Sequence, residues 1–114
     1  MKIAVKRVYD VLSTDKSFRV LVDRLWPRGL VREKAKIDLW LKEIAPSDEL
    51  RRWFHQNLEE RASFKKKYFQ ELKQKQEIVS QLKKQAKKQP VTLLYSSKNE
   101  EFNNAAVLKE YLEK

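Results

Sequence analysis

The sequence contains no cysteine and a single histidine, and these two scarcities restrict the chemistry open to the chain. Without cysteine there can be no disulfide, no thiolate nucleophile and no cysteine-ligated metal or iron–sulfur site. One histidine, His55, cannot form a site of several histidines, so only oxygen-ligated metals remain conceivable and we expect neither a metal nor a cofactor. Glycine is equally scarce, since Gly29 stands alone, and the chain therefore lacks a glycine-rich phosphate-binding loop.

Long hydrophobic runs are also missing from the sequence. No apolar run approaches the ~20 residues that a membrane-spanning helix requires. The first residues lead into Ile3-Ala4-Val5, which is typical of a strand rather than of a signal peptide, and we therefore expect a cytoplasmic protein without membrane contact. The chain has 114 residues, of which 41% are hydrophobic, and it predicts one domain over residues 1–114.

Acidic residues are fewer than basic residues, so that the formal net charge is +10 at pH 7. Residues 61–89 hold ten basic and two acidic residues, so this segment supplies most of the excess. Lysine mixed with glutamine, as in residues 83–89, is typical of a solvated helix face. Clustered lysines also occur on surfaces that follow nucleic-acid phosphates or contact acidic proteins. We interpret the segment first as solvated, with nucleic-acid binding as an alternative that is possible but not favoured.

The spacing of apolar residues predicts alternating strands and helices. Three short apolar runs bounded by turn-forming residues predict strands at 3–8, 18–23 and 91–95. Helical spacing predicts helices at 37–44, 47–58, 63–88 and 102–112. Lys75 interrupts the apolar stripe of the third helix, which is either continuous or broken near Lys73–Gln76. These elements predict an α/β fold with a small, mainly parallel sheet of about three strands covered by four to five helices.

The segment 18–29 carries the strongest functional signal, because a buried strand runs directly into a charged turn. The strand is continuously apolar from Val20 to Val22, as expected where both faces of a sheet are covered. Pro27 and Gly29 then restrict the backbone of the turn to a few conformations. The charged and aromatic residues of this turn are Asp23, Arg24, Trp26 and Arg28.

Residues 23–29 read Asp-Arg-Leu-Trp-Pro-Arg-Gly, which resembles the signature of the YeaO-like family of small bacterial proteins. Further motifs agree in order and spacing over essentially the whole chain: Lys6-Arg7-Val8-Tyr9-Asp10, Glu43-Ile44-Ala45-Pro46-Ser47, Phe54-His55 and Thr92-Leu93-Leu94-Tyr95-Ser96-Ser97-Lys98-Asn99. The resemblance favours parallel first and second strands, although the nine residues 9–17 between them are long for a hairpin and short for a crossover. It implies a fold rather than a reaction.

Polar residues follow each predicted strand at its carboxyl end, where ligands bind in open α/β sheets. Arginine predominates among them, and its planar guanidinium binds phosphate or carboxylate through two parallel hydrogen bonds. We therefore predict a site for a small phosphorylated or nucleotide-like anion. The candidate ligand-binding residues are Arg7, Tyr9, Asp23, Arg24, Trp26, Arg28, Ser96, Lys98 and Asn103.

An enzyme is also conceivable at this site, although no residue is designated as a nucleophile. Asp23 would act as a general base and Lys98 would stabilise anionic charge. Ser96 or Tyr95 would relay a proton, and His55 is a further catalytic candidate.

A purely structural interpretation stands beside these roles. Asp23 would then pair with Arg7, Arg19 or Arg24, Trp26 would fill the core in whole or in part, and His55 would be a hydrogen-bonded structural group. The alternative function is a nucleic-acid-binding or regulatory module that uses the lysine-rich face of residues 61–89.

Overall fold

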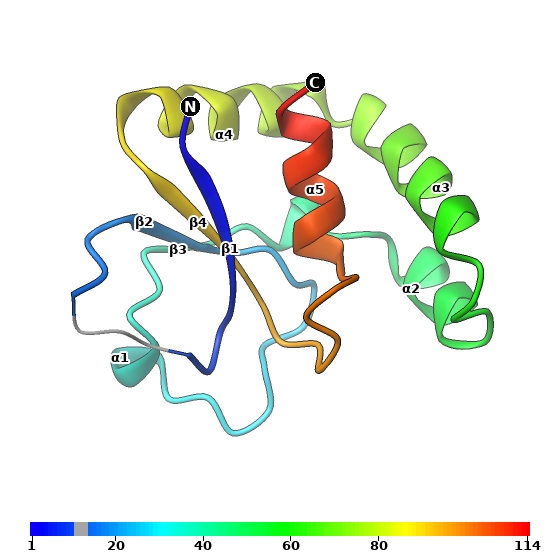
Figure 1. Ribbon diagram of the computed structural model, residues 1–114, viewed down its shortest axis with the longest axis horizontal. Coiled ribbons are helices and arrows are strands. Elements are labelled where there is room, and N and C mark those ends of the chain that lie inside the picture. Colours follow the sequence, from blue (N-terminus) through cyan, green and yellow to red (C-terminus); the bar gives the residue numbers. More distant parts are fainter. Residues whose placement is uncertain (11–13) are drawn as a thin grey trace.

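The computed structural model describes residues 1–10 and 14–114 and shows an α/β fold with one parallel sheet (Figure 1). Residues 11–13, in the predicted connection between the first two strands, lie outside the described residues. The elements are β1 (Ile3–Arg7), β2 (Phe18–Leu21), α1 (Arg32–Ala35), β3 (Leu39–Trp40), the 3-10 helix η1 (Lys42–Ile44), α2 (Asp48–His55), α3 (Arg61–Lys73), α4 (Gln76–Lys88), β4 (Val91–Tyr95) and α5 (Asn104–Leu112).

The last strand of the chain lies in the middle of the sheet, whose order is β1-β4-β2-β3. Every residue of β4 is buried, because β1 pairs with it on one side and β2 on the other, both in parallel. The two registers meet at Leu93, which lies opposite Val5 of β1 and Val20 of β2. The α/β fold with a mainly parallel sheet is thus confirmed, with four strands instead of about three. The first two strands run parallel, but β4 separates them.

The helix predicted at 37–44 is wrong. Leu39 and Trp40 form the edge strand β3, and the following residues make the single 3-10 turn η1. The backbone explains the difference, because Asp38 N–H donates to Arg19 O at 2.9 Å and Leu41 N–H donates to Leu21 O at 2.8 Å. These donors are therefore paired with β2 and are not available to a helix.

The long helical stretch is broken, as the interruption by Lys75 indicated. α3 ends at Lys73 and α4 begins at Gln76. Lys75 between them is half-buried, and its Nζ donates to Ala45 O at 3.0 Å, so the lysine enters the interior with a partner. Burial lowers the pKa of Lys75. The break lets α3 and α4 pack as separate helices.

The two faces of the sheet are covered by different parts of the chain, since successive strand residues point to opposite sides. Val20 and Val22 belong to the large core, whose buried residues come also from α3, α4 and α5. Leu21, between them, belongs to a second cluster with Val8 and Leu94. That smaller cluster is covered by the segment 26–40 through Trp26, Leu30, Ile37 and Trp40. The sheet is thus buried on both sides, and the loops at its carboxyl end are left to form a site.

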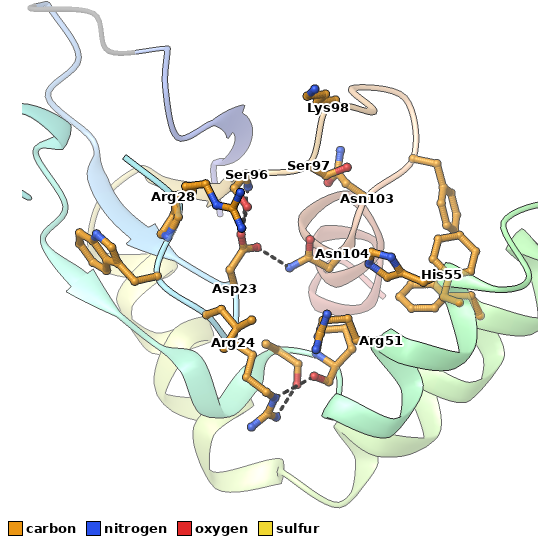
Figure 2. A pocket seen from close by; sticks show the side chains of 18 residues that line it. Asp23, Arg24, Arg28, Arg51, His55, Ser96, Ser97, Lys98, Asn103 and Asn104 are labelled. Atoms are coloured by element: carbon orange, nitrogen blue, oxygen red, sulfur yellow. Dashed lines mark hydrogen bonds between the residues drawn. The ribbon is translucent and has the colours of Figure 1, made fainter. Parts of the chain in front are cut away.

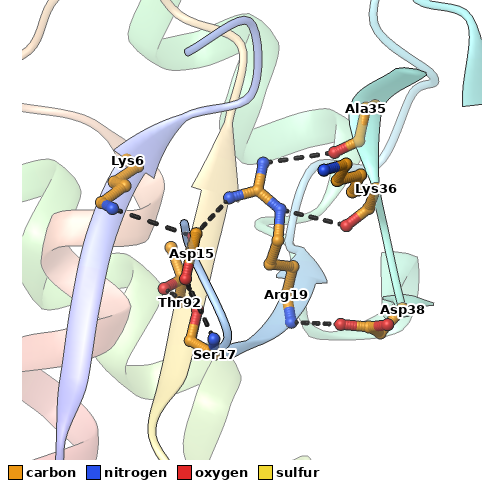
Figure 3. Close-up of polar contacts among 8 residues, drawn as sticks. All are labelled: Lys6, Asp15, Ser17, Arg19, Ala35, Lys36, Asp38 and Thr92. Carbon is orange, nitrogen blue, oxygen red and sulfur yellow. Dashed lines mark hydrogen bonds and ion pairs between the residues drawn. The ribbon is translucent and has the colours of Figure 1, made fainter. Parts of the chain in front are cut away.

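A buried arginine ties the opposite, amino-terminal edge of the sheet together (Figure 3). Arg19 of β2 is 2% exposed, and its Nη1 donates to Asp15 Oδ2 at 2.7 Å. Its Nε and Nη2 donate to the carbonyls of Lys36 and Ala35 at 3.0 and 3.2 Å. Lys36 ends α1 in the left-handed region, with φ of 52°, so an unusual backbone conformation accompanies the carbonyl that Arg19 binds. Each of the three guanidinium nitrogens thereby donates a hydrogen bond, and Asp15 supplies the opposite charge that a buried cation requires.

Hydrogen bonds from Ser17, together with Arg19, lower the pKa of Asp15 from 3.8 to about 2. Ionised Asp15 therefore stabilises the fold above pH 4, and this contribution is lost as the pH falls through the folded-state pKa.

We predict that Asp15→Asn lowers the free energy of unfolding at pH 7 by about 2 kcal/mol, from the size of the pKa shift. The difference from the wild type should shrink by about half at pH 3, because Asp15 of the unfolded chain then becomes protonated. Urea unfolding at pH 7, 5, 4 and 3 measures both quantities. Asp10→Asn, at an exposed carboxylate, is the matched control. A loss that is the same at every pH would contradict the role given to the Asp15 charge.

Candidate functional site

A cleft of about 760 Å³ opens at the carboxyl ends of β2 and β4 (Figure 2). Its walls come from the loop after β2, the turn before α2, one face of α2, the loop after β4 and the start of α5. Eight of the eleven candidate residues line it, and they are Asp23, Arg24, Trp26, Arg28, His55, Ser96, Lys98 and Asn103. The cleft thus lies at the carboxyl end of the sheet, where ligands bind in open α/β sheets.

Asp23 lies at the centre of this cleft, where it joins three segments of the chain. Its Oδ2 accepts hydrogen bonds from the backbone N–H and the hydroxyl of Ser96, at 3.0 and 2.6 Å. Its Oδ1 accepts from Asn104 Nδ2 at 3.1 Å. Burial raises the pKa of Asp23, whereas these hydrogen bonds oppose the rise. Among the residues that the structure describes, no cation lies within ion-pair distance of this carboxylate, so the ion pairs considered from the sequence are replaced by neutral hydrogen bonds.

The arginines of the cleft differ in what they bind. Arg24 donates from Nε to Pro46 O at 3.0 Å and from Nη2 to Ala45 O at 3.3 Å, and so fastens the loop after β2 to the turn before α2. Arg28, in contrast, is exposed, and so is Lys98 on the opposite wall. Within residues 1–10 and 14–114, neither of these two side chains donates a hydrogen bond or forms an ion pair. Arg28 and Lys98 are therefore available to a ligand.

Arg51 of α2, which was not among the candidates from the sequence, is a further cation that lines the cleft. Its Nη2 pairs with Asp48 at 2.6 Å on the same helix. Its Nε is buried and has no acceptor among the described residues. A buried donor without a partner lowers the stability of a protein by about 1–3 kcal/mol. An oxygen atom of a ligand in the cleft would give the Arg51 guanidinium an acceptor. The sequence contains a signal for this position, because Arg51 lies three and four residues before Phe54 and His55 and residues at this spacing are neighbours on a helix surface.

Three candidates from the sequence lie outside the cleft. Arg7 donates to the carbonyls of Ser97 and Ser96, at 3.0 and 3.4 Å. Tyr9 lies beneath the Arg7 guanidinium, and its hydroxyl donates to Arg28 O at 2.8 Å. Both residues thus hold the two loops that carry Arg28 and Lys98. Tyr95 of β4 is 3% exposed, and burial raises its pKa, so it is unsuited to proton transfer in the cleft.

Aromatic rings form the apolar part of the cleft. Phe54 lies 4.4 Å from Phe64 and 5.6 Å from Phe102, measured between ring centroids, and all three line the cleft. Trp26 also lines it, but its indole N–H donates to Leu30 O at 3.0 Å and its ring packs edge-on against Trp40. Trp26 is therefore half in the core. The cleft offers apolar surface beside exposed cations.

Two neighbouring asparagines at the start of α5 have separate tasks. Asn103 is the N-cap of the helix, since its side chain accepts from Ala106 N–H at 2.8 Å, and it is 5% exposed. Asn104, which sequence reasoning missed, donates to both Val22 O and Asp23 Oδ1. Nothing in the sequence distinguishes it from Asn103, because its role depends on where β2 ends in space.

The part of the chain that the structure describes contains no cluster of three histidine, aspartate or glutamate side chains placed to hold a metal ion. In the same residues, no helix is long and apolar enough to cross a membrane.

The fold and the cleft define a small α/β protein with a parallel sheet, in which polar loops and α2 surround a cleft lined by cations. The chain belongs to the family described as the inactive DUF488-N3 subclade, whose sequence model matches residues 2–114. It is 47% identical over 112 residues to "Uncharacterized protein YeaO" of Escherichia coli K12, a match that covers 98% of this chain and 97% of the relative. It is 34% identical over 111 residues to "Uncharacterized protein Rv3073c" of Mycobacterium tuberculosis, covering 97% and 93% of the two chains.

The resemblance to the YeaO-like family is thereby confirmed over nearly the whole length of the chain. No solved structure matches the sequence significantly.

We predict that Arg24→Ala and Arg28→Ala affect stability differently. Arg24→Ala should lower the free energy of unfolding by about 1–3 kcal/mol, because the carbonyl of Pro46 loses its donor and that of Ala45 loses one of two. This corresponds to a fall of several degrees in Tm for a domain of this size. Arg28→Ala removes an exposed side chain and should change stability by less than about 0.5 kcal/mol. Thermal unfolding by circular dichroism compares the two, and equal losses would contradict the distinction.

Proposed function

We propose that the protein binds a small phosphorylated ligand in the cleft at the carboxyl ends of β2 and β4, and that it acts as a binding protein. The observation that carries the proposal is the charge of the lining, which includes four Lys or Arg residues and a single carboxylate. The carboxylate, Asp23, is occupied by Ser96 and Asn104. Arg28 and Lys98 therefore face the cleft without a matching acid among the described residues.

The position of the exposed cations supports phosphate as the anion. Arg28 and Lys98 lie on opposite loops, and the contacts of Arg7 and Tyr9 hold both loops in place. Loops that are already fixed bring their cations to an anion at a smaller entropic cost than mobile loops do. The guanidinium of Arg28 matches the oxygens of a phosphate in two-pronged fashion, and the Lys98 ammonium adds a compact charge.

Binding fits the site better than turnover. His55 lines the cleft, but among the described residues no side chain accepts or donates a hydrogen bond that would orient its ring as a base. Asp23 and Ser96 bond to each other, which holds the cleft together instead of presenting a nucleophile. The family that the chain matches is described as inactive, and this supports a protein that recognises its ligand without transforming it.

The lysine-rich face of residues 61–89 offers a different partner. Several of its lysines contact aromatic rings: Lys65 lies over Phe69 and Lys67 over Trp53. Lys65 also pairs with Glu110 of α5. These contacts occupy part of the face, so an acidic or nucleic-acid partner has less free charge to meet than the composition suggests. A DNA duplex is therefore included in the test as the competing ligand.

The experiment is isothermal titration calorimetry at low salt with ribose 5-phosphate, inorganic pyrophosphate and a short DNA duplex. We expect the two small phosphates to bind, and Arg28→Ala with Lys98→Ala to lower their affinity at least about tenfold, since each charged hydrogen bond contributes about 1.5–3 kcal/mol. Lys84→Ala, which removes one exposed charge from α4, is the matched control and should leave both affinities unchanged. Duplex binding that depends on Lys84 and not on Arg28 would instead favour the nucleic-acid function. Absence of binding by every small phosphate would refute the proposed site.

A further inference from the structure

Asp23 and Asn104 form the part of the cleft lining that we call its floor, and each has an oxygen, Oδ1, that can accept a further hydrogen bond. Asn104 donates both hydrogens of its amide, one to Val22 O at 2.9 Å and one to Asp23 Oδ1 at 3.1 Å. These two bonds fix the orientation of the amide, so its Oδ1 must point away from them. Among the described residues no donor reaches that oxygen, and Asn104 lines the cleft beside Asp23 (Figure 2).

The carboxylate of Asp23 also has capacity left. Its Oδ2 accepts two hydrogen bonds from Ser96, which fill that oxygen, whereas Oδ1 accepts one from Asn104. An ionised carboxylate has about four acceptor positions, so one position on Oδ1 remains. The residues described here give Asp23 no cation, and burial raises its pKa. A ligand that supplies a positively polarised N–H group would therefore stabilise the charge that burial disfavours.

These acceptors restrict which end of a phosphorylated ligand can occupy the floor. A phosphate placed against Asp23 would meet a like charge in a partly desolvated position, which is unfavourable. Arg28 and Lys98 receive the phosphate instead, so the other end of the ligand must bring donors to Asp23 and Asn104. The rings of Phe54, Phe64 and Phe102 line the same cleft and favour a flat group as the other part of the ligand.

We infer that the ligand is a guanine nucleotide, whose base presents its N1–H and 2-amino donors to Asp23 Oδ1 and Asn104 Oδ1 while its phosphate binds Arg28 and Lys98. This inference rests on the proposed phosphate site and adds the identity of the group at the other end. Guanine carries two neighbouring N–H donors on one edge. Adenine places an acceptor at the same ring position, which would face the carboxylate without a hydrogen. Hypoxanthine keeps the ring N–H and lacks the amino group.

The test is a calorimetric comparison of GMP, IMP, AMP and ribose 5-phosphate on the wild-type protein. We expect GMP to bind at least about tenfold more tightly than AMP, with IMP between them, because a buried acceptor left without a donor costs about 1–3 kcal/mol. Ribose 5-phosphate should bind as weakly as AMP or more weakly. Equal affinities for GMP, AMP and ribose 5-phosphate would overturn the base assignment and leave the phosphate site standing. Failure of all four to bind would refute the site itself.

Asp23→Asn tests the acceptor directly, because it replaces one acceptor oxygen by an NH₂ group of similar shape. The variant should lose the preference for GMP over AMP, measured as the ratio of the two affinities on the same variant, so that a general loosening of the cleft affects both ligands alike. Asp10→Asn removes the same charge from an exposed position outside the cleft and should retain the preference. A preference for GMP that survives Asp23→Asn would overturn the role given to Asp23. If that variant fails to fold, the order of the four ligands on the wild type still decides the base assignment.

Discussion

The side chain of Asp23 is the contact on which the cleft depends. It follows β2, binds the first residue after β4 and receives the amide of the first residue of α5. Residues that lie 73 and 81 positions further along the chain therefore meet Asp23 at one carboxylate, and the backbone carbonyl of Asp23 accepts from the Trp40 indole as well. The same group draws the walls of the cleft together and gives its floor an acceptor character. The shape of the cleft and the ligand selectivity that we propose for it thus have a common origin.

The arginines of this protein have two different roles, and the composition of the sequence does not show which arginine has which role. Arg7, Arg19 and Arg24 bind backbone carbonyls, so that turns and loop ends without secondary-structure partners have donors. Such an arrangement fits guanidinium, which has five donors in a fixed plane. Arg28 is left at the surface, where the tied loops hold its backbone. The structural arginines thereby fix the position of the cation that is free to bind.

The strands and the place of the site followed from local patterns, because β4 is a continuous apolar run and polar residues begin where it ends. The edge strand β3 was not predicted. Two residues are too few to show the alternating pattern of a strand, and the flanking apolar residues match helical spacing. For the site, the sequence identified the arginines but not their partners. Whether Arg24 faces a carbonyl or a ligand depends on where residues 45 and 46 lie, and this is set by tertiary packing.

The central position of β4 also has a consequence for how the chain acquires its structure. β1 and β2 touch β4 and are separated by it, so the sheet cannot assemble around its middle until residues 91–95 are present. On a ribosome, the first ninety residues can form the helices α3 and α4 and the two-residue pairing of β2 with β3. The sheet can close only after residues 91–95 have been synthesised. Pairings over such long sequence distances are slow to form, and the apolar faces of α3 and α4 remain uncovered meanwhile.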